Sequence, residues 1–175
     1  MEKSENFYAA ASYDDVVKKV TAAVWILLVA ESLFFIYLFS VVVSQTSLAT
    51  MLRVFIPSIS LIVLLVPYLF KPKGFRLASK GLRIERLLNT ITVPYNQILD
   101  AQRGKWTWKA VRLGGSGGLY GYLGLFHLFG IGRVWMYTTN RHKMILIETK
   151  DGKKYAVSPE NPEDFVSQLQ KKVIK

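Results

Sequence analysis

Basic and aromatic side chains alternate in one short segment, which holds the densest group of chemically active residues in the chain. Its members are Arg103, Lys105, Trp106, Trp108, Lys109 and Arg112. Alternation along a strand would place both indole rings on one face. Cations beside tryptophans suit an anionic membrane interface, where each contributes roughly 1 kcal/mol, and they also suit single-stranded nucleic acid. The same pattern fits core tryptophans beneath a charged, solvated edge.

A single carboxyl lies near the centre of a long apolar run. Glu31 interrupts residues 20–43, where a charge is costly, so we expect the carboxyl to be neutral or hydrogen-bonded. If this run pairs antiparallel with residues 51–70, its depth matches Ser58 or Ser60. A hydrogen-bonded carboxyl that fixes helix register is favoured over a proton or ion site, because one carboxyl lacks the relay groups of a pathway.

Glycine is concentrated in residues 114–132, which contain eight glycines among Leu, Tyr and Phe. No Gly-Lys-Ser/Thr follows and the G-x-G-x-x-G spacing is absent, so nucleotide binding is poorly supported. One interpretation is a long loop and strand with glycines at bends and bulges. The other is a segment lying in a bilayer interface, residues 119–129. Its candidate anchors are Leu119, Tyr120, Tyr122, Leu123, Phe126 and Phe129.

Other reactive side chains form no recognisable constellation. The chain has no cysteine, which excludes disulfides, Cys-based zinc sites and thiol catalysis. His127 and His142 are isolated, and Ser116 and Ser158 lack a visible His/Asp partner arrangement. We therefore expect no catalytic residues, no metal site and no cofactor.

Charge divides the chain into two parts. Residues 71–175 carry 19 Lys and Arg against seven Asp and Glu, whereas the first 70 residues carry four basic and five acidic groups. The net charge of +11 therefore belongs to the C-terminal part. Such an excess points to anionic partners, and lipid headgroups are the nearest if the domain is tethered to a membrane.

Two apolar runs are long enough to cross a bilayer. Residues 20–43 would span about 36 Å as a helix, against a hydrocarbon core of about 30 Å. Residues 51–70 form the second run. The link between them, residues 44–50, is short and uncharged, so we expect a transmembrane hairpin over residues 20–70.

Lysines on both flanks predict how the hairpin is oriented. Lys18 and Lys19 precede the first run, and Lys71 and Lys73 follow the second. The positive-inside rule then places both termini in the cytoplasm of a multi-pass protein of the cell membrane.

The first 19 residues are expected to contain a short tail and the start of the first helix. The spacing Ser12-x-x-Asp15 is a capping box and predicts a helix that begins near residue 13. Residues 1–11 are then the tail.

Short alternating segments between turn residues predict strands in residues 71–175. The expected strands are residues 75–77, 82–87, 91–94, 98–102, 133–139, 143–149 and 153–157. Ile84, Arg86 and Leu88 do not alternate cleanly, so the register of the second strand stays open. Asp151-Gly152 is the strongest hairpin signal in the chain.

A helix with a full start signature follows the last strand. Asn161 is its N-cap, Pro162 its first residue, and Glu163 and Asp164 fill the first turn. Strands closed by one C-terminal amphipathic helix are the plan of a pleckstrin-homology (PH) domain. The predicted fold class is therefore an α+β membrane protein, with a transmembrane hairpin and a PH-like antiparallel β-barrel or sandwich.

Three segments also carry a family resemblance. They are GGLYGYLG at 117–124, GRVWMYTT at 132–139 and ILIETKDGKKYAVSPENPEDF at 145–165. Over about residues 71–170 the chain is similar to the prokaryotic PH-domain family of bacteria and archaea, whose members often carry two N-terminal spans. The ending Ser-Pro-x-x-Pro-x-x-Phe is the most diagnostic piece. The resemblance implies a fold and a membrane setting, but no reaction.

These observations favour a non-enzymatic protein whose PH-like domain docks on anionic headgroups or on a partner protein at the cytoplasmic membrane face. Lys71, Lys73 and the basic and tryptophan cluster are the candidate contacts. The alternative is a scaffold or accessory subunit that contacts other membrane proteins or a second copy of itself. An enzyme or transporter centred on Glu31 or the glycine-rich segment is a third hypothesis, and nucleic acid is the least favoured partner.

Overall fold

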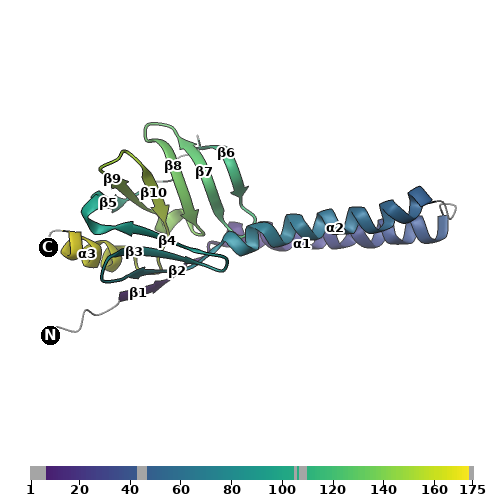
Figure 1. Ribbon diagram of the computed structural model, residues 1–175, viewed down its shortest axis with the longest axis horizontal. Helices are drawn as coiled ribbons and strands as arrows, with labels where there is room; N and C mark the ends of the chain where they lie inside the picture. The colour runs from purple at the N-terminus through teal and green to yellow at the C-terminus, as the bar shows by residue number, and fades with distance from the viewer. Residues whose placement is uncertain (1–6, 43–46, 105, 107–109, 174–175) are drawn as a thin grey trace.

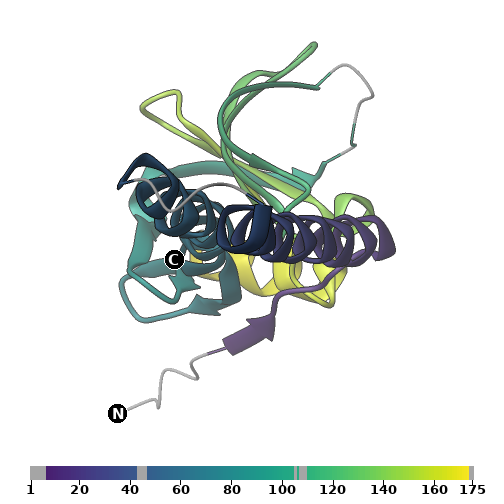
Figure 2. The same cartoon turned by 90° about the vertical axis from the view of Figure 1, so that its right-hand side faces the viewer.

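A helical hairpin projects from one end of a β-rich domain (Figure 1). This computed structural model describes residues 7–42, 47–104, 106 and 110–173. The C-terminal helix lies at the opposite end of the domain from the hairpin. Figure 2 shows the strands of the larger sheet curving on one side of the hairpin, with the N-terminal strand on the other.

The hairpin consists of α1 (Asp15–Tyr37), which continues into a π-helical turn η1 (Leu38–Val42), and α2 (Ser47–Phe70). Both helices are long and apolar enough to cross a membrane, over Asp15–Val41 and Thr50–Phe70, and almost none of their side chains is buried. The N-cap of α1 is Asp14, whose carboxylate accepts a hydrogen bond from the Val17 N–H. The predicted capping box at Ser12 is therefore two residues too early.

The smaller sheet is antiparallel, in the order β1-β2-β3-β4. Its strands are β1 (Phe7–Ala10), β2 (Pro72–Leu77), β3 (Gly81–Arg86) and β4 (Thr90–Pro94). β1 pairs with β2, with Phe7 opposite Leu77 and Ala10 opposite Gly74. The prediction of a tail over residues 1–11 is thus wrong for Phe7–Ala10. A four-residue strand beside a helix start is too short to show periodicity.

The larger sheet has the order β5-β9-β10-β8-β7-β6. Its strands are β5 (Ile98–Arg103), β6 (Ala110–Gly117), β7 (Tyr122–Leu128), β8 (Gly132–Thr138), β9 (Ile145–Thr149) and β10 (Lys154–Val157). The expected fully antiparallel arrangement fails at one place, because β10 runs parallel to β8. The turn after β9 returns the chain into the space beside β8, so β10 pairs with both strands.

Two apolar clusters fill the domain. The first packs the smaller sheet against β5, β9 and α3 (Pro162–Val173), with Phe75, Ile147 and Phe165 completely buried. The second lies against β7 and β8 and includes Phe126 and Met136. Two short 3-10 turns, η2 (Tyr95–Gln97) and η3 (Arg141–Lys143), connect the strands. The first residue of α1 that enters a core is Val17, so the hairpin and the domain share packing.

Candidate functional site

The start of α1 is fixed to the domain by a buried carboxylate. Asp14 Oδ1 accepts a hydrogen bond from the Val17 N–H at 2.7 Å, and Oδ2 accepts from the backbone N–H and Nε of Arg141 at 3.1 and 3.3 Å. Burial alone would raise the pKa of Asp14, but these hydrogen bonds and the Arg141 charge outweigh it and hold the pKa below its ordinary value. This contact orients the first helix relative to the connection between β8 and β9.

A seam of hydroxyl and amide groups continues this contact. The Thr139 N–H donates to Ser158 Oγ at 2.8 Å, the Asn140 side-chain amide donates to Ser12 Oγ at 2.9 Å, and the Ser12 N–H donates to the Ser158 carbonyl at 3.0 Å. Ser158 is completely buried here and holds the ends of the parallel strands β8 and β10 together. Its hydroxyl therefore has a structural role.

The glycine-rich turn between β6 and β7 packs on the base of the hairpin. Tyr120 has a left-handed φ of 58°, its N–H donates to Thr21 Oγ1 at 2.9 Å, and its hydroxyl accepts from Trp25 Nε1 at 2.7 Å. Gly118 has a φ of +117°, and a Cβ there would lie 3.2 Å from Val20 Cγ1. Glycine thus allows the turn to approach α1 closely.

Lys71 lies in an aromatic cage at the end of α2. Its Nζ is 4.2 Å from the ring centroid of Tyr68, 5.7 Å from that of Tyr120 and 6.0 Å from that of Tyr13. Burial, and then the charge of Lys73, lowers the pKa of Lys71. This candidate lipid contact is therefore engaged within the junction, where it contacts the segment before α1, the last turn of α2 and the β6–β7 turn.

The other predicted basic contacts do not form one cluster. Arg103 pairs with Glu163 of α3 at 3.6 Å, and α3 lies at the end of the domain away from the hairpin (Figure 1). Lys73 and Arg112 are exposed, and a Cβ at Gly117 would lie 3.6 Å from Arg112 Cδ, so the Arg112 side chain runs along β6 toward the hairpin. Lys105, Trp108 and Lys109 lie outside the described residues.

Trp106 is partly buried and packs against the second apolar cluster. Its ring centroid lies 4.6 Å from that of Tyr122, and the Arg141 guanidinium carbon lies 5.9 Å from the indole. Among the open interpretations of this segment, the one with core tryptophans fits Trp106.

The segment 119–129 is mostly part of the sheet. Tyr122, Leu123 and Phe126 are buried in β7 and therefore unavailable to a bilayer interface, which corrects the interfacial interpretation for these three residues. Leu119 is partly buried and Tyr120 contacts the hairpin, whereas Phe129 is exposed in the turn after β7. The interpretation as a strand with glycines at bends and bulges fits better, since the pairing of β6 with β7 contains a register shift.

The carboxyl in the hairpin has one of its two expected serine partners. Ser60 is buried, and its hydroxyl lies 3.3 Å from Glu31 Oε2 and 3.2 Å from the Ile56 carbonyl of its own helix, so one proton is shared between these two acceptors. Ser58 is exposed and donates instead to the Val54 carbonyl of its own helix. Glu31 thus links the two helices at one level through a single hydroxyl.

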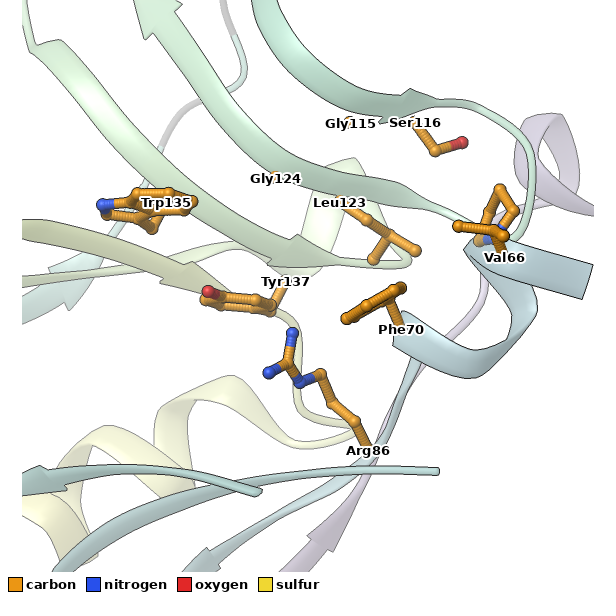
Figure 3. A pocket seen from close by; sticks show the side chains of 10 residues that line it. Val66, Phe70, Arg86, Gly115, Ser116, Leu123, Gly124, Trp135 and Tyr137 are labelled. Atoms are coloured by element: carbon orange, nitrogen blue, oxygen red, sulfur yellow. The ribbon is translucent and has the colours of Figure 1, made fainter. Parts of the chain in front are cut away.

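A cavity of about 380 Å³ lies where α2 meets the two sheets (Figure 3). One wall is the last turn of α2, with Val66, Pro67 and Phe70, and the other is the surface of β6, β7 and β8. The sheet wall is partly bare because Gly115 and Gly124 face each other across β6 and β7. A Cβ at Gly115 would lie 1.9 Å from the Leu123 carbonyl, so no larger residue fits there.

Arg86 supplies the charge of this cavity. Its guanidinium carbon lies 5.4 Å from the Phe70 ring centroid and 5.3 Å from that of Tyr137. Nη2 donates to the Asn89 side chain, but the buried Nε has no hydrogen-bond partner among the described residues. Burial lowers the pKa of Arg86. Figure 3 shows the guanidinium between the Tyr137 and Phe70 rings, at the edge of the apolar walls.

Sequence reasoning missed both Asp14 with Arg141 and the role of Arg86. The signal for Arg86 was present, because Leu82, Ile84 and Arg86 share one face of β3 and the first two are completely buried. A charge on the inward face of a strand is the feature to search for. The pairing of Asp14 with Arg141 spans 127 residues and leaves no local pattern.

Metal ligands are not grouped in the part of the chain that the structure describes, where no three His, Asp or Glu side chains are arranged to hold an ion. His127 lies edge-on to Phe129, with ring centroids 5.6 Å apart.

Two packed sheets closed at one end by a C-terminal helix define a PH-like domain, preceded here by two helices of membrane-spanning length. The family of bacterial PH domains matches residues 73–173, more than half of the chain, and the protein belongs to it. No curated protein and no solved structure matches the chain.

Proposed function

We propose that this protein is a non-enzymatic, membrane-anchored PH-like module that docks on anionic headgroups or on a partner protein at the cytoplasmic face. The proposed membrane anchor is supported by the hairpin, because long apolar side chains on both of its helices are exposed. Soluble proteins rarely expose so large a continuous apolar surface. The hairpin therefore fits a lipid environment, with the domain next to the bilayer surface.

Lysine positions support an orientation with both termini in the cytoplasm of the cell. Lys18, Lys19 and Lys73 are exposed at the domain end of the hairpin. Arg112 adds a charge on the same side because its side chain runs toward the hairpin. Exposed cations at this level are attracted to anionic headgroups, by about 1 kcal/mol each.

The orientation can be tested because the natural chain has no cysteine. Ser47→Cys places a single thiol at the far end of the hairpin, and Ser167→Cys places one on the exposed side of α3. A membrane-impermeant maleimide should label Ser47→Cys in intact cells and Ser167→Cys only after lysis. Labelling in the opposite pattern would overturn the orientation, and loss of the protein from membranes after alkaline carbonate extraction would overturn the anchor.

Docking on headgroups can be tested with the full chain in lipid nanodiscs. Hydrogen exchange of β6 should be slower in discs with phosphatidylglycerol than in discs of phosphatidylcholine alone. Lys73→Gln with Arg112→Gln should remove that difference, whereas Arg103→Gln, at the far end of the domain, should preserve it. Equal exchange in both lipids would contradict the lipid version of the proposal.

A scaffold role is the second candidate, and one observation favours it. β6 is an edge strand that pairs only with β7 among the described residues, with Val111 and Leu113 exposed along it. An open edge can accept a strand from another protein. Gentle detergent extraction and native mass measurement should then find a partner that Val111→Lys loses. A monomer or homo-oligomer with no partner would count against this role.

A further inference from the structure

The cavity between α2 and the sheets has features that the proposed docking surface does not use. Its walls are apolar, yet Arg86 brings a full positive charge to it. The six ion pairs among the described residues do not include Arg86. The neighbouring carboxylate of Glu85 is taken by Arg76 at 2.7 Å. Asn89 accepts from Nη2 of this partly buried guanidinium, but the Nε atom is buried and has no hydrogen-bond partner among the described residues, and such a donor normally has one.

We infer that this cavity is a binding site for one anionic phospholipid, whose phosphate pairs with Arg86 while its glycerol and upper acyl chains lie on the apolar wall. The inference rests on the proposed anchorage of the hairpin in a membrane. It goes beyond headgroup docking, because it assigns an individual lipid to a defined pocket formed jointly by a hairpin helix and the domain.

The position of the cavity identifies the occupant. Val66, Pro67 and Phe70 belong both to the cavity wall and to the apolar helix segment Thr50–Phe70. The cavity therefore opens at the level where that segment leaves the bilayer, and a lipid of the adjacent leaflet can enter sideways. A free phosphate would satisfy Arg86 but leave the apolar wall uncovered.

Charge and size agree with this occupant. A guanidinium matches the geometry of phosphate oxygens through two N–H donors, and Nε of Arg86 is a donor with no partner among the described residues. A volume of about 380 Å³ holds a headgroup and glycerol but not whole acyl chains, which would remain in the bilayer. Trp135, partly exposed at the sheet wall, can pack against the lipid.

The test uses the full chain in nanodiscs of equal parts phosphatidylglycerol and phosphatidylcholine, released into the gas phase for native mass spectrometry. The wild type should retain one phosphatidylglycerol in preference to phosphatidylcholine. Arg86→Gln should reduce that preference about tenfold or more, because a hydrogen-bonded charge pair is lost. The control Arg83→Gln removes an exposed arginine from the same strand and should leave the preference unchanged.

Two further measurements distinguish failure of the lipid-binding inference from misfolding of the variant and from failure of the proposed membrane anchor. Val66→Trp fills the cavity without altering Arg86 and should also release the lipid, which protects the test if Arg86→Gln folds poorly. Inorganic phosphate at millimolar concentration should not displace phosphatidylglycerol, and displacement would show an anion site without lipid selectivity. A protein that inserts fully but retains both lipids equally overturns the inference alone, whereas failure to insert overturns the proposed function.

Discussion

The two helices of the hairpin enter the domain in different ways. At the start of α1, the buried Asp14 carboxylate accepts hydrogen bonds from the backbone N–H groups of Val17 and Arg141 and from Nε of the partly buried Arg141 side chain. At the end of α2, Arg86 contacts two aromatic rings and one side-chain amide, and a cavity of about 380 Å³ lies beside it. The α1 junction is closely packed and the Asp14 carboxylate is hydrogen-bonded. The α2 junction contains a cavity, and Nε of Arg86 has no hydrogen-bond partner among the described residues.

The two junctions suit different roles, because the first is closely packed and the second has room for a ligand. Buried polar groups that satisfy one another rigidify a contact, so the α1 junction sets the angle between hairpin and domain. A cavity lined by glycines and apolar side chains loses packing and is not explained by stability. The α2 junction therefore makes sense as a site with an occupant, and the comparison can be tested by changing each junction separately.

The largest effect is expected from Asp14→Ala. This change leaves the partly buried Arg141 charge without its partner and removes the N-cap of α1, so the free energy of unfolding should fall by about 2–4 kcal/mol. Thermal unfolding in detergent measures the loss. The adjacent Asp15→Ala is a matched control, because its pair with Lys18 is exposed and should contribute less than about 0.5 kcal/mol. Equal effects of the two changes would contradict a special role for Asp14.

Lowering the pH should weaken the junction between α1 and the domain, because it protonates Asp14. The folded state lowers the pKa of Asp14 from its ordinary value of 3.8. Its stabilising contribution is therefore complete above the ordinary pKa and is lost as pH falls through the lower folded-state pKa. Melting temperatures recorded from pH 6 to pH 2 should fall more for the wild type than for Asp14→Asn, which caps the helix at every pH. Parallel curves would show that another carboxyl dominates.

A smaller effect is expected where the glycine-rich turn contacts α1. Trp25→Phe removes the donor to the Tyr120 hydroxyl and should cost about 1 kcal/mol. Tyr120→Phe should cost a similar amount, and the double variant should cost less than the two single changes together, because both remove one shared bond. Strict additivity in unfolding measurements would mean that the 2.7 Å contact contributes nothing.

Patterns that repeat along the chain predicted much of this architecture. The two apolar runs, the Asp151-Gly152 hairpin and the start of α3 at Pro162 all agree with the structure. Each depends on neighbours within a few residues, where periodicity and turn chemistry act directly. The family match at residues 73–173 supports the PH-like plan that these elements suggested.

Contacts between distant segments were beyond such patterns. β1 pairs with β2 across the whole hairpin, and the parallel pairing of β8 with β10 depends on where β9 returns the chain. The predicted cluster of basic residues likewise could not be placed in space from sequence alone. Arg103 and Arg112 are nine residues apart in sequence, but the first pairs with α3 and the second runs toward the hairpin. The cavity itself needs α2 and the large sheet together, so no single segment predicts it.

The smallest change in stability is expected at the hollow junction. Without lipid, Arg86→Gln should alter the free energy of unfolding by less than about 1 kcal/mol, because the lost contacts with Phe70 and Tyr137 are offset by removal of a partly buried charge whose Nε has no partner among the described residues. Added phosphatidylglycerol should then raise the melting temperature of the wild type but much less that of the variant, since only a ligand of the folded state stabilises it. A large loss of stability without lipid would instead make Arg86 a structural residue like Arg141, and the contrast between the two junctions would disappear.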